Sequence, residues 1–260
     1  MNKKILELIK KKRELSQISE KDIEIAYSRF EKNDLLEEEK IEKTREILRK
    51  NFIAFVSKKL LSQKDKDIEW ILRKHISTKE RLPFYQEIYN RIFKKFKKLT
   101  LIDLGAGING FSYSFFPKKV DVNYIGIESV GQLVDLTNFY FKKNKISGKV
   151  IHMSIFEKEK LKEIIKKQEK PRVIFLFKVI DSLEIFKKNY SKELILELIG
   201  LVDFIVLSFA TKTLRNKKPF FAKRDWIMNF IKENFKVLDD FEFGGERYFI
   251  FSKFETKKDL

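Results

Sequence analysis

The sequence of 260 residues contains no cysteine and only two histidines. Without cysteine, the chain can form no disulfide, no zinc–cysteine or iron–sulfur centre and no cysteine nucleophile. Two histidines are too few for a His-based metal site, so we expect no bound metal. Apolar runs stay short of the roughly 20 residues that cross a bilayer, and charges interrupt the basic N-terminus, which argues against a signal peptide. We therefore expect a cytoplasmic protein without a membrane partner.

Glycine and proline are also scarce, with nine glycines and four prolines in the whole chain. Residues 1–98 hold one proline and no glycine, which favours helix throughout that region. Apolar residues at helical spacing predict helices near the N-terminus, at about 36–61 and at 67–74. Ser19, three residues before Asp22, resembles the N-cap of another helix.

Positive charge is in large excess, with 56 Lys and Arg against 38 Asp and Glu, a formal net charge of +18. An excess of this size points to a polyanionic partner, although a basic protein kept soluble by its charge is an alternative. We interpret residues 1–74 as a helical, basic region that binds RNA of the ribosome. A solvated charged face is the alternative for any single helix. Its candidate phosphate contacts are Lys10, Lys11, Lys12 and Arg13.

From Leu99 onward, apolar strands alternate with amphipathic helices. This order predicts an α/β fold with a mainly parallel, Rossmann-like sheet covered on both faces. Two last strands, 236–243 and 246–253, flank Gly244-Gly245 and predict a C-terminal antiparallel hairpin. The other expected strands are 99–103, 122–128, 149–153, 172–179 and 202–209, and the expected helices are about 110–116, 130–143, 157–168, 182–199 and 223–234.

A glycine turn follows the first expected strand, with the spacing G-x-G-x-x-G over 105–110. Such a turn lets a ligand approach the backbone closely, and Glu128 at the end of the next strand is placed to accept hydrogen bonds from a ribose. The pattern alone equally suits a nicotinamide or flavin protein. Asp103 gives the order D-L-G-A-G, which resembles the first motif of S-adenosylmethionine-dependent methyltransferases. We favour that class over a dehydrogenase.

Five segments together resemble a narrower family, the 16S rRNA guanine-N7 methyltransferases related to the aminoglycoside-resistance enzymes. The segment 75-HISTKER-81 looks like that family's H-x-S-T-x-E-R motif, and 103-DLGAGIN-109 is similar to its D-L-G-C-G-x-N turn. The others are 175-FLFKVI-180, 208-SFATKTL-214 and, more loosely, 243-FGGERY-248. The chain departs from the pattern at Ala210, where the family has proline, and over 216–219.

The resemblance implies a methyltransferase domain over residues 75–260 with S-adenosylmethionine as its cofactor. Arg81 would bind the methionine carboxylate, because its fork of donors suits a carboxylate as lysine cannot. Residues 75–85 resemble a loop that leads into a helix, and this helix precedes the first expected strand. The implied cofactor contacts are His75, Ser77, Arg81, Asp103, Gly105, Ala106, Gly107, Glu128, Ser154, Ile155, Phe177 and Lys178.

The implied substrate is 16S rRNA within the small ribosomal subunit, near the decoding site, bound by a monomer. Guanine N7 carries a lone pair and no proton, so its methylation needs no catalytic base, and Lys178 and Lys212 would serve for positioning. The target base would be flipped into the pocket. Another RNA or a small molecule as substrate, and a non-catalytic RNA-binding protein on the same fold, stay open as alternatives. Further implied RNA contacts are Lys212, Arg215, Lys217 and Lys218.

Overall fold

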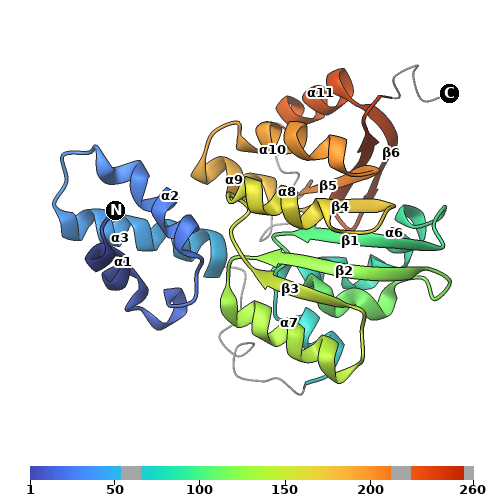
Figure 1. The fold of residues 1–260 in the computed structure, drawn as a ribbon, viewed down its shortest axis with the longest axis horizontal. Coiled ribbons are helices and arrows are strands. Elements are labelled where there is room, and N and C mark those ends of the chain that lie inside the picture. The colour runs from blue at the N-terminus through green and yellow to red at the C-terminus, as the bar shows by residue number, and fades with distance from the viewer. Residues whose placement is uncertain (54–65, 212–223, 255–260) are drawn as a thin grey trace. The chain divides into compact units, whose positions relative to one another are not determined.

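The computed structural model describes residues 1–53, 66–211 and 224–254, with helices first and a sheet after them (Figure 1). The N-terminal helical elements are α1 (Lys3–Lys10), η1 (Arg13–Leu15), α2 (Glu20–Glu31), α3 (Glu37–Leu48) and the π-helical η2 (Arg49–Ile53). Before the first strand come α4 (Ile68–Leu72), α5 (Ile76–Arg81), η4 (Leu82–Phe84) and α6 (Tyr85–Ile92).

Within the described residues, seven strands form one sheet in the order β3-β2-β1-β4-β5-β7-β6. The ladders of β1 with β4 and of β4 with β5 are parallel, whereas β7 runs antiparallel to both β5 and β6. The strands are β1 (Lys98–Leu104), β2 (Asp121–Glu128), β3 (Gly148–His152), β4 (Arg172–Phe177), β5 (Phe204–Ala210), β6 (Lys236–Phe243) and β7 (Glu246–Ser252). The helical elements between them are η5 (Asn109–Phe115), α7 (Gly131–Lys143), α8 (Lys158–Lys166), α9 (Ile180–Phe186), α10 (Tyr190–Leu198), η6 (Ile199–Leu201) and α11 (Asp225–Asn234).

This architecture confirms the predicted α/β fold and its terminal hairpin. Gly244 and Gly245 both have positive φ, 60° and 83°, as the tight turn between two twisted strands requires. Strand and helix positions after residue 98 match the expectation closely, because buried apolar runs alternate there with amphipathic segments.

Two expected elements end or break earlier than the apolar pattern predicts. The single helix expected over 182–199 is wrong, since α9 and α10 are separated at Asn189, whose left-handed φ of 63° cannot continue a helix. The Glu184 carboxylate holds this break by accepting hydrogen bonds from the N–H groups of Asn189 and Ser191 at 2.5 and 2.9 Å. Strand β4 stops before Lys178, where a φ of 55° leaves the extended conformation.

The segment expected as a loop at 75–85 is already helical, and this too is a correction. Helix α5 follows His75, and the Thr78 hydroxyl donates to the carbonyl of Leu72 at 2.6 Å, so that a side chain links α5 to the end of α4. Of the helix expected over 36–61, the described part is α3 continued by η2, and residues 54–61 lie outside the described ranges.

The chain divides into two compact units. Unit 1 comprises Met1–Leu82, Gly105–Ser114 and Ile125–Lys158, and unit 2 comprises Pro83–Leu104, Phe115–Tyr124 and Glu159–Leu260. In unit 1, α1, α2 and α3 pack on one another (Figure 1). In unit 2, stacked rings of Tyr89, Phe93 and Phe175 fill the core, with centroids 5.8–6.3 Å apart. The N-terminal helices and the glycine turn therefore belong to the same unit.

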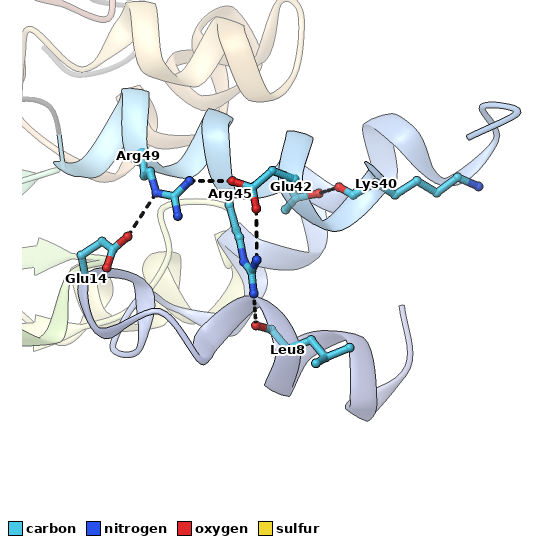
Figure 2. A network of polar contacts seen from close by, with 7 residues as sticks. Leu8, Glu14, Lys40, Glu42, Arg45 and Arg49 are labelled. Atoms are coloured by element: carbon cyan, nitrogen blue, oxygen red, sulfur yellow. Dashed lines mark hydrogen bonds and ion pairs between the residues drawn. The ribbon is translucent and has the colours of Figure 1, made fainter. Parts of the chain in front are cut away.

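A polar network joins the N-terminal helices to one another (Figure 2). Arg45 donates to the carbonyl of Leu8 at 2.6 Å and to Glu42 at 3.0 Å. Arg49 donates to Glu42 at 2.9 Å and to Glu14 at 3.1 Å. The hydrogen bond from Arg49, followed by the one from Arg45, lowers the pKa of Glu42. This network links α1 and η1 to α3 and η2.

Candidate functional site

The glycine turn after β1 is fixed by hydrogen bonds to the end of β2. Gly105 and Gly107 have positive φ, 70° and 52°, a conformation that other residues rarely adopt. The N–H groups of Gly105 and Ala106 both donate to the carbonyl of Ile127, at 2.9 and 3.1 Å. A Cβ on Gly107 would lie 3.5 Å from Nε2 of His75. His75, Gly105, Ala106 and Gly107, all expected to bind the cofactor, thus meet in unit 1.

Glu128 is the acidic residue that ends β2, and its side chain is buried. Its Oε2 accepts from the Gly107 N–H at 2.8 Å, and its Oε1 accepts from the Val130 N–H at 2.8 Å. Backbone N–H groups thus donate to both oxygens of this buried carboxyl. This places a fixed acceptor beside the glycine turn, as the sequence predicts for a residue that binds ribose.

Arg81 lies at the end of α5 with only 3% of its surface exposed. Its Nη1 donates to Oδ1 of Asn109 at 3.1 Å, which links α5 to a residue within the glycine turn. Asn109 is buried, and its carbonyl accepts from the Ser112 hydroxyl at 2.6 Å. The sequence motif contains Asn109, but sequence reasoning assigned it no role. Ser77 lies half-buried in the same helix as Arg81.

The third glycine of the turn serves packing. A Cβ on Gly110 would lie 2.6 Å from Cγ2 of Thr137 and 3.0 Å from the ring of Phe141, both on α7. Only glycine therefore permits this approach of α7. Beside the turn, the ring of Phe111 stacks on Tyr140 of α7 with centroids 4.4 Å apart.

Ser154 and Ile155 follow β3, and both are buried. The Ser154 hydroxyl accepts from the Phe156 N–H at 3.1 Å, and the N–H of Met153 donates to the Glu128 carbonyl at 3.0 Å. The loop after β3 is thus joined to the end of β2 in unit 1. This is the expected neighbourhood for residues that flank an adenine beside a ribose-binding carboxylate.

Asp103 stands in unit 2, where it is buried in β1. The hydroxyl of Tyr124 on β2 donates to its Oδ2 at 2.6 Å. Burial, together with the charge of Asp103, raises the pKa of Tyr124 well above its ordinary value. The tyrosine partner had no signal in the sequence beyond its place in an apolar strand.

Phe177 and Lys178 end β4 in unit 2. The Phe177 ring stacks on Phe175 at 4.2 Å and meets Tyr248 edge-on at 5.6 Å. The Lys178 ammonium lies 3.1 Å from Oε2 of Glu246, a side chain that is 2% exposed. These two residues occupy the carboxyl end of a parallel strand, where ligands bind in α/β sheets.

Glu246 and Ser208 complete this cluster, and sequence reasoning missed both as site residues. The Ser208 hydroxyl on β5 donates to Oε1 of Glu246 on β7 at 2.5 Å. The backbone N–H of Lys178 also donates to the Ser208 carbonyl, at 3.1 Å. A charged residue at the start of a hairpin strand, opposite a lysine-bearing strand end, is the signal that could have indicated the pair.

The candidate RNA contacts are only partly described. Lys11, Lys12 and Arg13 are exposed after α1, whereas Lys10 is half-buried and pairs with Glu20 at 3.3 Å. The remaining candidates, Lys212, Arg215, Lys217 and Lys218, lie outside the described residues.

Residues 1–53, 66–211 and 224–254 hold neither a cluster of metal ligands nor a helix that could span a membrane. In these ranges no three His, Cys, Asp or Glu side chains gather as metal ligands would. In the same part of the chain, helices fall short of the length and apolarity that a membrane crossing needs.

A family model described as ribosomal RNA methyltransferase (FmrO) matches residues 47–230. The chain is similar in fold to the 16S rRNA methyltransferase RmtF in complex with S-adenosyl-L-homocysteine, with 17% identity, a TM-score of 0.80, and coverage of 97% of this chain and 99% of that one. An rRNA methylase from Escherichia coli gives 17% identity, a TM-score of 0.76 and coverage of 96% and 98%. The 16S rRNA methylase ArmA gives 26% identity, a TM-score of 0.59 and coverage of 75% and 97%. Curated protein sequences give no match.

Proposed function

Because the chain belongs to the ribosomal RNA methyltransferase (FmrO) family, we propose that it methylates N7 of a guanine in 16S rRNA, using S-adenosylmethionine. The proposed substrate is the small ribosomal subunit near its decoding site. Membership in this family confirms the resemblance drawn from the motifs at 75–81 and 103–109. The similar folds of two 16S rRNA methyltransferases support the same rRNA as substrate.

The single observation that supports the cofactor most strongly is the convergence of Arg81 and Glu128 on the glycine turn of unit 1. Arg81 contacts Asn109, and Glu128 contacts Gly107, so a buried cation and a buried anion each hold one part of the turn. This set fits a ligand with a carboxylate at one end and a ribose further along. When bound, S-adenosylmethionine supplies an electrophilic methyl group. Arg81 would hold the methionine carboxylate and Glu128 the ribose hydroxyls.

Methylation at guanine N7 requires no catalytic base from the protein. Guanine N7 is an unprotonated acceptor, so its attack on a methyl group releases no proton from the base. The protein's part is then to bind and orient the guanine and to keep water away. Lys178, held by Glu246, is a candidate for positioning the base. Lys212 is proposed for the same role.

The exposed cations after α1 are proposed to contact rRNA phosphates. Reversing Lys11, Lys12 and Arg13 to glutamate is expected to raise KM for small subunits at least tenfold and to leave cofactor affinity unchanged. Reversing the exposed Lys166, Lys167 and Lys170 changes the net charge equally and serves as the matched control. Equal losses in both triple variants would indicate a general charge effect and would argue against a binding surface after α1.

The proposed function is tested by incubating the protein with radiolabelled S-adenosylmethionine and, separately, small subunits, free 16S rRNA and tRNA. Label is expected in the 16S rRNA of the small subunit. Label found only in tRNA would instead indicate another RNA as substrate, and label found in none of them would contradict the proposal.

An rRNA substrate within ribosomes also implies action in the cytoplasm, and we propose that the protein acts as a monomer.

A further inference from the structure

A short stretch of the N-terminal region lies against the segment that follows β2. Residues 17–19 run antiparallel to residues 129–131, with Ile18 opposite Val130. Two backbone hydrogen bonds of 2.9 and 2.8 Å join the two stretches. The fit is close, since a Cβ on Gly131 would lie 2.9 Å from the side-chain oxygen of Gln17.

Asp22, in the first turn of α2, also contacts the segment that follows β2. Its carboxyl is 3% exposed, and the hydroxyl of Ser129 donates to its Oδ2 at 2.6 Å. Ser154, which follows β3, also acts on the carboxyl of Asp22 and lowers its pKa. Asp22 is therefore directed into the interior of unit 1. Ser19 stands at the N-cap position of α2, as the sequence suggested, although its side chain makes no capping hydrogen bond.

The two serines that contact Asp22 adjoin the residues proposed to bind the cofactor. Ser129 directly follows Glu128, and its carbonyl is contacted by Nε2 of His152 at 2.9 Å. Glu128 itself accepts from the N–H of Val130 at 2.8 Å, so its carboxylate is tied to the stretch that Asp22 and residues 17–19 hold. Ser154 is the residue proposed to flank the adenine.

We propose that Asp22 is a positioning residue of the cofactor pocket, supplied by the N-terminal helical region and acting through Ser129 and Ser154. This inference rests on the proposed function for the identity of the cofactor. It gives the N-terminal helices a second role beside RNA contact. Through Asp22 and residues 17–19, these helices fix the backbone next to Glu128 and Ser154, the residues proposed to contact the ribose and the adenine.

The electrostatics of Asp22 agree with this geometry. Burial, with smaller contributions from the charges of Glu128 and Glu157, raises its pKa to about 6, while the hydrogen bonds from Ser129 and Ser154 act in the opposite direction. A buried carboxyl is costly unless its hydrogen bonds are satisfied. We therefore expect loss of the interactions between Asp22 and these serines to weaken cofactor binding.

The test measures the Kd for S-adenosyl-L-homocysteine by calorimetry on the full chain. Asp22→Ala is expected to weaken binding about tenfold, the equivalent of losing one good hydrogen bond to a charged group. Asp22→Asn keeps an acceptor of the same shape and is expected to stay within about threefold of the wild type. Glu24→Gln, on an exposed face of α2, is the matched control and is expected to bind as the wild type does.

A second readout separates positioning from general destabilisation. In the methyl-transfer assay, Asp22→Ala should raise KM for S-adenosylmethionine while kcat at saturating cofactor is retained, because the pocket is loosened and the reacting groups are untouched. A variant that merely unfolds would lose kcat in proportion to its unfolded fraction. If Asp22→Ala does not fold, Ser129→Ala replaces it, with an expected weakening of about threefold.

Wild-type affinity in a folded Asp22→Ala or Ser129→Ala variant would overturn the inference. A wild-type protein that binds S-adenosyl-L-homocysteine but methylates no rRNA would overturn the proposed substrate and leave the role of Asp22 standing. A wild-type protein that does not bind S-adenosyl-L-homocysteine would overturn both.

Discussion

Two buried carboxyl groups, Asp22 in unit 1 and Glu246 in unit 2, are held in different ways. Asp22 accepts from the hydroxyl of Ser129, with Ser154 and acidic residues nearby. Glu246 accepts from one serine hydroxyl and also pairs with the ammonium of Lys178 at 3.1 Å. Both carboxyls are nearly inaccessible, at 3% and 2% exposure. They differ in whether a positive charge accompanies the negative one.

The two carboxyl groups therefore tolerate different changes. A carboxyl with hydroxyl partners can take up a proton when burial makes its charge costly, and the raised pKa of Asp22 reflects this. A carboxylate paired with an ammonium is bound to its partner, because removing either group leaves the other buried without compensation. We therefore expect unit 1 to respond to pH at Asp22 and unit 2 to respond to loss of charge at Glu246.

The largest effect is expected on breaking the pair in unit 2. Glu246→Ala should lower the free energy of unfolding by about 3 kcal/mol or more, because the Lys178 ammonium would stay buried without its partner. Chemical denaturation measures this change. Replacing both residues, as in Lys178→Met with Glu246→Leu, should cost less than the single change. A single variant within about 0.5 kcal/mol of the wild type would contradict a buried pair of this kind.

Arg81 extends the comparison to a buried cation that donates to the side-chain oxygen of Asn109. Arg81→Ala should weaken binding of S-adenosyl-L-homocysteine about 100-fold, since charge-assisted, bidentate hydrogen bonds to a carboxylate are strong. Arg81→Lys should recover only part of this loss, because an ammonium lacks the fork of donors. Calorimetry checks both variants. Full recovery by lysine would mean that Arg81 contributes charge alone.

The pH response of Asp22 should come next in size. Its folded-state pKa of about 6 lies above the ordinary value of 3.8, so the folded state binds the proton more tightly than the unfolded state. Stability contributed by the protonated group is present at low pH and is lost as pH rises through the interval between these values.

The stability of the wild type relative to Asp22→Asn should therefore fall by about 2 kcal/mol between about pH 4 and about pH 7. Parallel denaturation curves at the two pH values measure the difference and cancel the titration of groups common to both proteins. A constant difference across this range would show that Asp22 titrates normally.

The smallest effect is expected in the network of Figure 2, where the Glu42 side chain is about half-exposed. Glu42→Gln should change the free energy of unfolding by less than about 1 kcal/mol, because solvent and salt screen such pairs. Thermal or urea denaturation at low and high salt measures it. A loss of several kcal/mol would mean that the network, and not the apolar core, holds α1, η1 and α3 together.

Much of the fold could be predicted because local signals agreed with the tertiary structure. Apolar strands that end in glycines at 105–110 and at 244–245 left few alternatives to a parallel sheet with a terminal hairpin. The break at Asn189 was missed, since it depends on a left-handed residue held by Glu184 rather than on glycine or proline. The helix α5 was missed because serine and threonine at 77–78 suggested a cap.

The site was predictable where a motif carries its own chemistry, and not where it depends on distant partners. The glycine turn, Arg81 and Glu128 stand in recognisable order along the sequence. Asp22 resembled one part of a helix cap, because its contacts with Ser129 and Ser154 arise only when segments more than 100 residues apart meet. Glu246 likewise reaches Ser208 only because β7 pairs with β5 in the folded sheet.

Locating the methyl group in the rRNA distinguishes guanine N7 from every other acceptor atom. Small subunits treated with the protein and S-adenosylmethionine can be analysed by borohydride reduction and aniline cleavage, which cut the chain at N7-methylguanine. We expect one new cleavage in 16S rRNA, at a guanine near the decoding site, and no such cleavage without cofactor. Methyl transfer without any such cleavage would contradict the assignment to guanine N7.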